Sequence, residues 1–119
     1  MNDKIELKLP SKPEYISLIR LTASSIANNI DLNVDEIEDI KVCISEACIN
    51  VLNFADTEEI NVLFNLKEDG IYIEIKDVLE DIPEDVEHSK QGIMGLLIIN
   101  SLMDSVEFKD SHIIMIKYI

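Results

Sequence analysis

The sequence is poor in basic residues, and this shortage limits what the protein can bind. Lysine and arginine together number 10 against 24 acidic residues, which gives a formal net charge of -14. A surface of this charge repels phosphate backbones and anionic lipid headgroups. Nucleic acid and membrane are therefore poor candidates for partners. A basic protein surface is a better candidate, although an acidic balance can also serve solubility alone.

Long apolar runs and a secretion leader are absent as well. The sequence has no stretch of 18 or more apolar residues, and its first residues lack the charged and apolar regions of a signal peptide. Its two cysteines, Cys43 and Cys48, lie five residues apart in a predicted helix, where their side chains point in different directions, so we expect no disulfide between them. Because free thiols are typical of the reducing cytosol, we predict a cytoplasmic protein.

The remaining composition is that of one folded unit. A chain of 119 residues with 47% hydrophobic residues can form one domain with a core, which we place at residues 1–119, and is too short for two. Apolar spacing predicts strands over residues 4–9, 60–66, 71–75, 105–109 and 112–118, and helices over residues 14–29, 34–55 and 91–103. This order predicts a two-layer α/β sandwich, with a mixed, mostly antiparallel sheet and its helices on one face.

The longest predicted helix, residues 34–55, carries two kinds of chemistry. At about 100° per residue one side is apolar and the other polar. The apolar side carries Ile37, Ile40, Ile44, Cys48, Val51, Leu52 and Ala55, and the other side carries Asp39, Glu46, Asn50 and Asn53. Glu46 and Asn50 are one turn apart and are therefore neighbours on the helix surface. The polar side is either a solvated surface or part of a site, and the pattern alone favours the solvated surface.

Two later features carry similar chemistry. Asp77 continues the phase of the apolar residues in strand 71–75, so its carboxylate is predicted to face the helical layer, unless the strand ends earlier and Asp77 faces water. Gly92 and Gly95 open the third helix, where backbone N–H groups can approach a phosphate closely. Two glycines at this spacing can also be caps or sites of tight helix packing. Each feature is a weak signal by itself.

Their order along the chain resembles that of a known family. The stretch ISEACINVLNFA, residues 44–55, is similar to the N box of the histidine-kinase-type (GHKL) ATPases. The stretch QGIMGLLIINSLMDSVEF, residues 91–108, is similar to their second glycine box with the helix and strand that follow. Within that superfamily, the likeness is to the anti-sigma-factor serine/threonine kinases, and the matching order of strands and helices extends it over most of the chain.

The resemblance implies a Bergerat-type site for ATP and Mg²⁺. It implies Asn50 at the magnesium ion, Asp77 at the adenine amino group, and Gly92 and Gly95 at the nucleotide. It also implies that Glu46 is the base that deprotonates the acceptor serine. The partners that it implies are a sigma factor and an anti-anti-sigma protein, and it further implies a homodimer.

The sequence departs from the family pattern in the segment that follows Asp77. The family's Asp-x-Gly-x-Gly box keeps only its aspartate here, and Phe54 stands where the N box usually ends in histidine. Several carboxylates lie between Asp77 and Gly92, and like charge near a triphosphate is unfavourable. The alternative function is therefore a non-catalytic binding module of the same fold that regulates a transcription or signalling partner.

Overall fold

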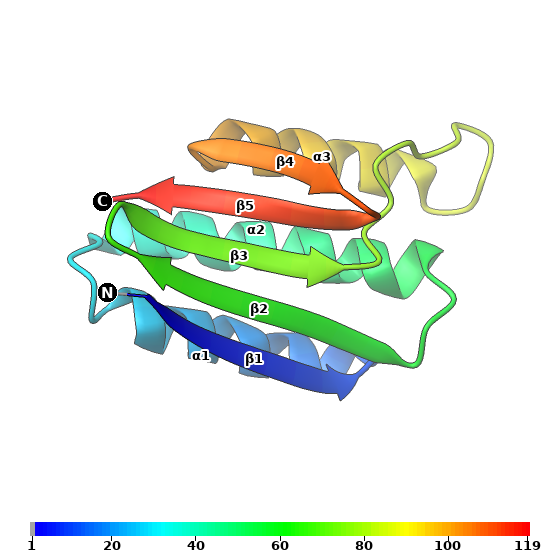
Figure 1. Ribbon diagram of the computed structural model, residues 1–119. Helices are drawn as coiled ribbons and strands as arrows, with labels where there is room; N and C mark the ends of the chain where they lie inside the picture. The colour runs from blue at the N-terminus through cyan, green and yellow to red at the C-terminus, as the bar shows by residue number, and fades with distance from the viewer. Residues whose placement is uncertain (1) are drawn as a thin grey trace.

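The computed structural model describes residues 2–119, which form a sheet covered on one face by helices (Figure 1). The strands are β1 (Asp3–Pro10), β2 (Glu59–Lys67), β3 (Gly70–Lys76), β4 (Ser105–Lys109) and β5 (His112–Tyr118). The helices are the short 3-10 turn η1 (Pro13–Tyr15), α1 (Ile16–Ala27), α2 (Val34–Phe54) and α3 (Ser89–Leu102). The predicted two-layer α/β sandwich is confirmed.

The sheet has the strand order β1-β2-β3-β5-β4, and each of these pairings is antiparallel. The predicted sheet was mixed and mostly antiparallel; in residues 2–119 it is antiparallel throughout. Consecutive strands pair through hairpins at β2–β3 and β4–β5, which need no crossover helix. In the sequence, α3 lies between the two hairpins. In the sheet, β5 lies beside β3, and β4 forms an edge (Figure 1).

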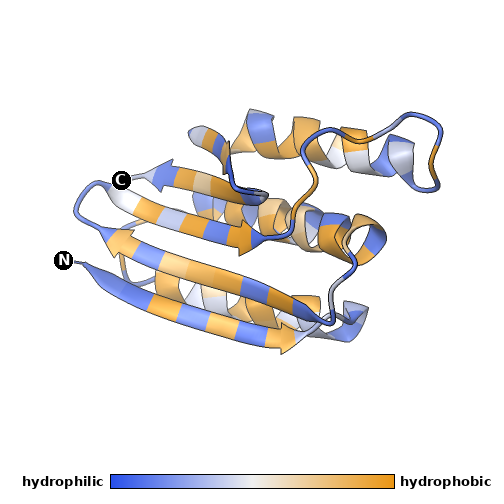
Figure 2. Cartoon of the chain, turned by 45° about the vertical axis from the view of Figure 1, so that its right-hand side comes forward, coloured by the Kyte–Doolittle hydropathy of each residue, from blue (hydrophilic) through white to orange (hydrophobic). Residues whose placement is uncertain are grey.

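The core lies between the sheet and the helices. Apolar and polar residues alternate along the strands, as the orange and blue bands of Figure 2 show, so that one face of each strand is buried. Ile73 of β3, Met115 of β5 and Phe64 of β2 are fully buried on that face, and Ile44 of α2 is fully buried in the same cluster. Burying such a side chain contributes about 1.5–3 kcal/mol.

A local signal in the sequence fixes the start of α2. At its start the Asn33 side chain accepts a hydrogen bond from the Glu36 N–H (2.8 Å), and the Glu36 carboxylate accepts one from the Asn33 N–H (3.0 Å). This capping box satisfies two N–H groups that the helix leaves unpaired. The helix ends at Phe54, because Ala55 is extended. In the helical layer α2 lies between α1 and α3 (Figure 1).

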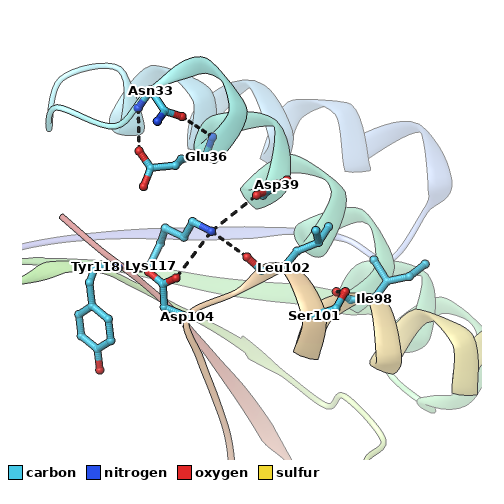
Figure 3. A network of polar contacts seen from close by, with 9 residues as sticks. All are labelled: Asn33, Glu36, Asp39, Ile98, Ser101, Leu102, Asp104, Lys117 and Tyr118. Carbon is cyan, nitrogen blue, oxygen red and sulfur yellow. Dashed lines mark hydrogen bonds and ion pairs between the residues drawn. The ribbon is translucent and has the colours of Figure 1, made fainter.

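A buried lysine holds the end of α3 against the sheet. Lys117 of β5 is 6% exposed, and its ammonium group donates a hydrogen bond to the Leu102 carbonyl at 2.7 Å (Figure 3). The same nitrogen lies 3.6 Å from an Asp39 oxygen and 3.9 Å from an Asp104 oxygen. A cation suits the C-terminal carbonyls of a helix, and the two carboxylates offset the loss of hydration of its charge. The contact joins α2, α3 and β5.

The two hairpin turns differ in how well the sequence predicts them. The β4–β5 turn forms at Asp110 and Ser111, as predicted, with φ of 54° and 66°. In the β2–β3 hairpin, Gly70 pairs with Lys67 and is already the first residue of β3, so the turn consists of residues 68–69. Gly70 has no positive φ. Glycine is required there because a Cβ atom would lie 2.3 Å from the Lys117 carbonyl oxygen.

Cys43 and Cys48 form no disulfide, as predicted, and both are fully buried. Burial is the main cause that raises the pKa of each thiol to about 12. For Cys43, the nearby Asp39 carboxylate raises the pKa further and the Lys117 ammonium opposes the shift. In residues 2–119 no helix has the length and apolar character that crossing a membrane requires.

We predict that Gly70→Ala lowers the free energy of unfolding by about 2 kcal/mol or more, because the new methyl group overlaps backbone that cannot move without disturbing the β3–β5 pairing. Urea denaturation followed by circular dichroism measures this change. Glu58→Ala, at an exposed loop position, is the control and should change stability by less than about 0.5 kcal/mol. Equal stability of Gly70→Ala and the control would contradict the close approach of β3 and β5.

We predict that neither cysteine reacts with a thiol-specific reagent at pH 8 while the protein is folded. The thiolate is the reactive form, and a pKa of about 12 leaves almost none of it at that pH. In urea both thiols should react at the rate of a free cysteine, with a midpoint that coincides with unfolding. Rapid labelling of the folded protein at Cys43 or Cys48 would show that the α2 core opens locally.

Candidate functional site

Asn50 connects α2 to the chain that leaves the sheet. Its side chain is on the inner part of the helix and is 3% exposed. The carboxamide oxygen accepts a hydrogen bond from the Leu79 N–H at 2.8 Å, and the carboxamide nitrogen donates one to the Leu79 carbonyl at 3.0 Å. A buried amide needs such partners. The two hydrogen bonds therefore fix the backbone of Leu79 against α2.

Asp77 lies just beyond the end of a strand. The strand β3 ends at Lys76, and Asp77 takes a left-handed conformation with φ of 64°. It is exposed, whereas Val78 is turned into the core and donates its N–H to the Ser111 carbonyl at 3.2 Å. Of the two alternatives for Asp77, the early end of the strand is therefore the one that the structure shows.

Asp77 lines a pocket of about 430 Å³ at one end of the sheet. Three segments form its walls: the end of α2, residues 77–81, and the β4–β5 turn. The lining residues are Phe54, Ala55, Asp56, Asp77, Val78, Leu79, Glu80, Asp81, Phe108, Lys109, Asp110 and Ser111. A pocket of this size can hold a small ligand. Its carboxylates favour a ligand that donates hydrogen bonds and disfavour an anion.

Glu46 lies at the contact between α2 and α3. It is half-buried, and a Cβ atom placed on Gly95 would lie 2.7 Å from a Glu46 carboxylate oxygen. The absence of a side chain at Gly95 therefore leaves room for the Glu46 carboxylate against α3. Glu46 and Asn50 are one turn apart on α2, as predicted, but neither is among the residues that line the pocket.

Gly92 is covered by two apolar side chains. A Cβ atom at Gly92 would lie 2.7 Å from the Ile82 Cδ1 atom and 2.7 Å from the Phe54 Cε2 atom. Both side chains are half-buried. Phe54 also belongs to the wall of the pocket. Phe54 therefore contributes both to the wall of the pocket and, together with Ile82, to the packing against Gly92 of α3.

Comparison with known proteins agrees with this architecture. The histidine kinase-like ATPase domain family matches residues 9–117. The chain belongs to this family. It is also 37% identical to proteins named serine-protein kinase RsbW from Bacillus cereus (strain ATCC 10987 / NRS 248), Bacillus mycoides (strain KBAB4) and Bacillus thuringiensis subsp. konkukian (strain 97-27). Each alignment covers 98% of this chain and 86% of the relative. The predicted relationship to the serine kinases of the histidine-kinase-type ATPases is confirmed.

Membership of the histidine kinase-like ATPase family implies ATP binding. The residues of this region fit the adenine end of ATP better than its triphosphate end. The exposed Asp77 carboxylate in the pocket can accept a hydrogen bond from the amino group of a nucleobase. The triphosphate end does not fit this arrangement. Asn50 is buried and bonded to Leu79, so it presents no open oxygen to a metal ion, and Phe54 and Ile82 cover Gly92.

Sequence reasoning missed two residues of this region, Leu79 and Ile82. Leu79 is bonded to α2 through its backbone, and the Ile82 side chain lies over the first turn of α3. For Ile82 the sequence holds one signal, which is a lone apolar residue in an acidic segment. Burial of an apolar side chain is favourable, so such a residue indicates an ordered position. For Leu79 the sequence holds no such signal, since a backbone contact does not depend on the type of side chain. In the sequence, Phe54 is recognisable only as a departure from the family pattern.

We predict that Asn50→Asp lowers the free energy of unfolding by about 1–3 kcal/mol and speeds amide exchange at residues 78–82. The carboxylate can still accept from the Leu79 N–H, but it cannot donate to the Leu79 carbonyl and becomes a buried charge. Hydrogen exchange followed by mass spectrometry measures the effect. Asn53→Asp, close to one turn later on α2 and half-buried, is the matched control. Equal effects of the two substitutions would show that the hydrogen bonds to Leu79 do not hold the segment.

Proposed function

We propose that this protein is an anti-sigma-factor-like serine/threonine protein kinase. In this proposal it binds ATP with Mg²⁺, transfers phosphate to a serine of an anti-anti-sigma protein, and sequesters a sigma factor. The observation that carries the proposal is the 37% identity, over 98% of the chain, to relatives named serine-protein kinase. That span includes α2, the end of β3 and α3, the elements that carry every residue of the proposed site.

The roles proposed for the site residues follow from their chemistry. Glu46, half-buried at the α2–α3 contact, would accept the proton of the attacking serine hydroxyl. Asp77 would hold the adenine amino group in the pocket, and Asn50 would bind magnesium after releasing Leu79. Gly92 and Gly95 would allow close approach of phosphate to α3. ATP would supply the phosphoryl group, and magnesium would offset its negative charge.

The charge of the protein bears on its partners. A formal charge of -14 favours partner surfaces with an excess of lysine and arginine, which it also attracts at a distance. We further propose that the protein acts in the cytoplasm, where its two free cysteines would remain reduced. A single domain over residues 1–119 and a homodimer complete the proposal.

We predict that Glu46→Gln abolishes phosphate transfer to the serine partner and leaves the affinity for ATP within about threefold of wild type. The amide has nearly the same shape but cannot accept the hydroxyl proton. Transfer of labelled phosphate measures the first effect, and isothermal titration with ATP and Mg²⁺ measures the second.

The matched control is Glu38→Gln, which removes an equal charge from an exposed position on the same helix. The Glu38 carboxylate contacts Lys41 on the surface of α2, at 3.0 Å, and its loss should leave both transfer and ATP affinity close to wild type. Transfer that survives in Glu46→Gln would reject Glu46 as the base.

A second function is favoured by two observations. Phe54 and Ile82 pack against Gly92 of α3, and the segment after Asp77 lacks the family's glycines. Both features suit a non-catalytic binding module that keeps the fold and the partner surface. Absence of any heat or thermal shift on titration of the wild-type protein with ATP and Mg²⁺ would leave this second function alone.

A further inference from the structure

The open face of the sheet, which the helices leave uncovered, carries its charged side chains in rows (Figure 1). Successive side chains of a strand point to opposite faces, so the residues that alternate with the buried core positions lie on the open face. The strand registers bring one residue of each strand to the same level there. At the end of the sheet near the β4–β5 turn, this level forms a basic row, which consists of Lys8, Asn61, Lys76, His112 and Lys109.

An acidic row lies two residues further along each strand, at a distance of about 7 Å. It consists of Glu6, Leu63, Glu74, Ile114 and Glu107, which are partners in the registers of the five strands. Members of both rows line one hollow of about 380 Å³ on this face, among them Lys8, Asn61, Lys76, Glu6, Leu63 and Glu74. The two rows therefore lie side by side across the whole sheet.

The charges of the two rows are mostly unpaired within the chain. Among residues 2–119 the one charged contact of either row joins Glu74 to His112, whose Nδ1 atom lies 2.6 Å from a carboxylate oxygen. The three lysines of the basic row form no ion pair in that range, nor do the other two glutamates of the acidic row. These side chains are free to contact an opposite charge on another molecule.

The open face is also nearly neutral in a strongly acidic protein. It carries five of the 10 basic residues and four of the 24 acidic ones. The five are Lys4, Lys8, Lys67, Lys76 and Lys109, and the four are Glu6, Glu59, Glu74 and Glu107. The rest of the chain therefore carries all of the net negative charge. Two copies of the protein repel each other least when they approach through their open faces.

We propose that the open face binds the open face of a second copy, with the basic row of each copy opposite the acidic row of the other. The two-fold axis of this dimer runs across the strands, between the two rows. Lys8 then lies opposite the second copy's Glu6, and Lys109 lies opposite the second copy's Glu107. The proposal rests on the homodimer of the proposed function and adds the face that forms it.

The order of the charges selects this orientation over the other two-fold one. Rotation about an axis that runs across the strands exchanges the two rows, so that opposite charges meet at each strand that carries them. Rotation about an axis along the strands would place each row opposite itself, where like charges repel. The same contact would remove the half-buried apolar side chains of Leu63 and Ile114 from water, which is favourable.

The test exchanges the charges of the two rows on the edge strands β1 and β4. One variant combines Lys8→Glu with Lys109→Glu, and the other combines Glu6→Lys with Glu107→Lys. Alone, each variant brings like charges together, so its dimer dissociation constant should be at least about 10-fold higher than that of wild type. Mixed in equal amounts, the two variants have complementary rows and should form a dimer about as tight as wild type. Sedimentation equilibrium measures each constant.

The matched control combines Lys12→Glu with Lys90→Glu, which makes the same change in net charge at exposed positions outside the strands. Its dissociation constant should stay within about threefold of wild type. If an edge variant folds poorly, Lys76→Glu and Glu74→Lys provide the same exchange on β3, with circular dichroism as the check on folding.

The outcomes separate the interface from the rest of the proposed function. A dimer that stays as tight as wild type in both charge-exchanged variants would overturn the open face as the interface and leave the homodimer standing. Variants that are weak alone and equally weak when mixed would overturn the facing of the two rows, as would an equal loss in the control. A wild-type protein that is monomeric throughout would overturn the homodimer and this interface together, while phosphate transfer is tested independently.

Discussion

Two hydrogen bonds between the Asn50 side chain and the Leu79 backbone decide how the helical layer meets the end of the sheet. They join residues that lie 29 positions apart in the sequence. Because Asn50 is 3% exposed, water cannot replace either bond in the folded protein, and the loss of one leaves a buried polar group unpaired. Leu79 is held next to Val78, which is buried in the core, and three residues before Ile82, which packs against Gly92.

The fold follows largely from local patterns, which is why the sequence predicts it well. The bounds of β4 and β5 coincide with the predicted strands, and Asp110 and Ser111 form the predicted turn. The two strands depend on the alternation of apolar and polar residues, and the turn depends on the chemistry of a few neighbouring residues. The β2–β3 turn is shorter than the gap between the two predicted strands, because Gly70 already belongs to β3. The need for glycine there arises from the backbone of β5, which comes much later in the sequence. A pattern confined to neighbouring residues contains no information about that approach.

The site is less predictable for the same reason. The spacing of Glu46 and Asn50 on one helix is a local property, and the structure keeps it. Whether the Asn50 carboxamide is open or bonded depends on Leu79, and the orientation of Asp77 depends on where β3 stops pairing with β5. Helical periodicity placed Asn50 on the polar side of α2. Its burial there is possible only because a distant segment supplies both a donor and an acceptor.

The segment after Asp77 combines two effects that differ in range. Repulsion between its carboxylates and a triphosphate is electrostatic, and salt screens such repulsion over about 8 Å at physiological ionic strength. The packing of Ile82 and Phe54 at Gly92 is apolar and short-ranged, so dilute salt changes it little. Screening can therefore reduce the first effect without moving the side chains that cover α3.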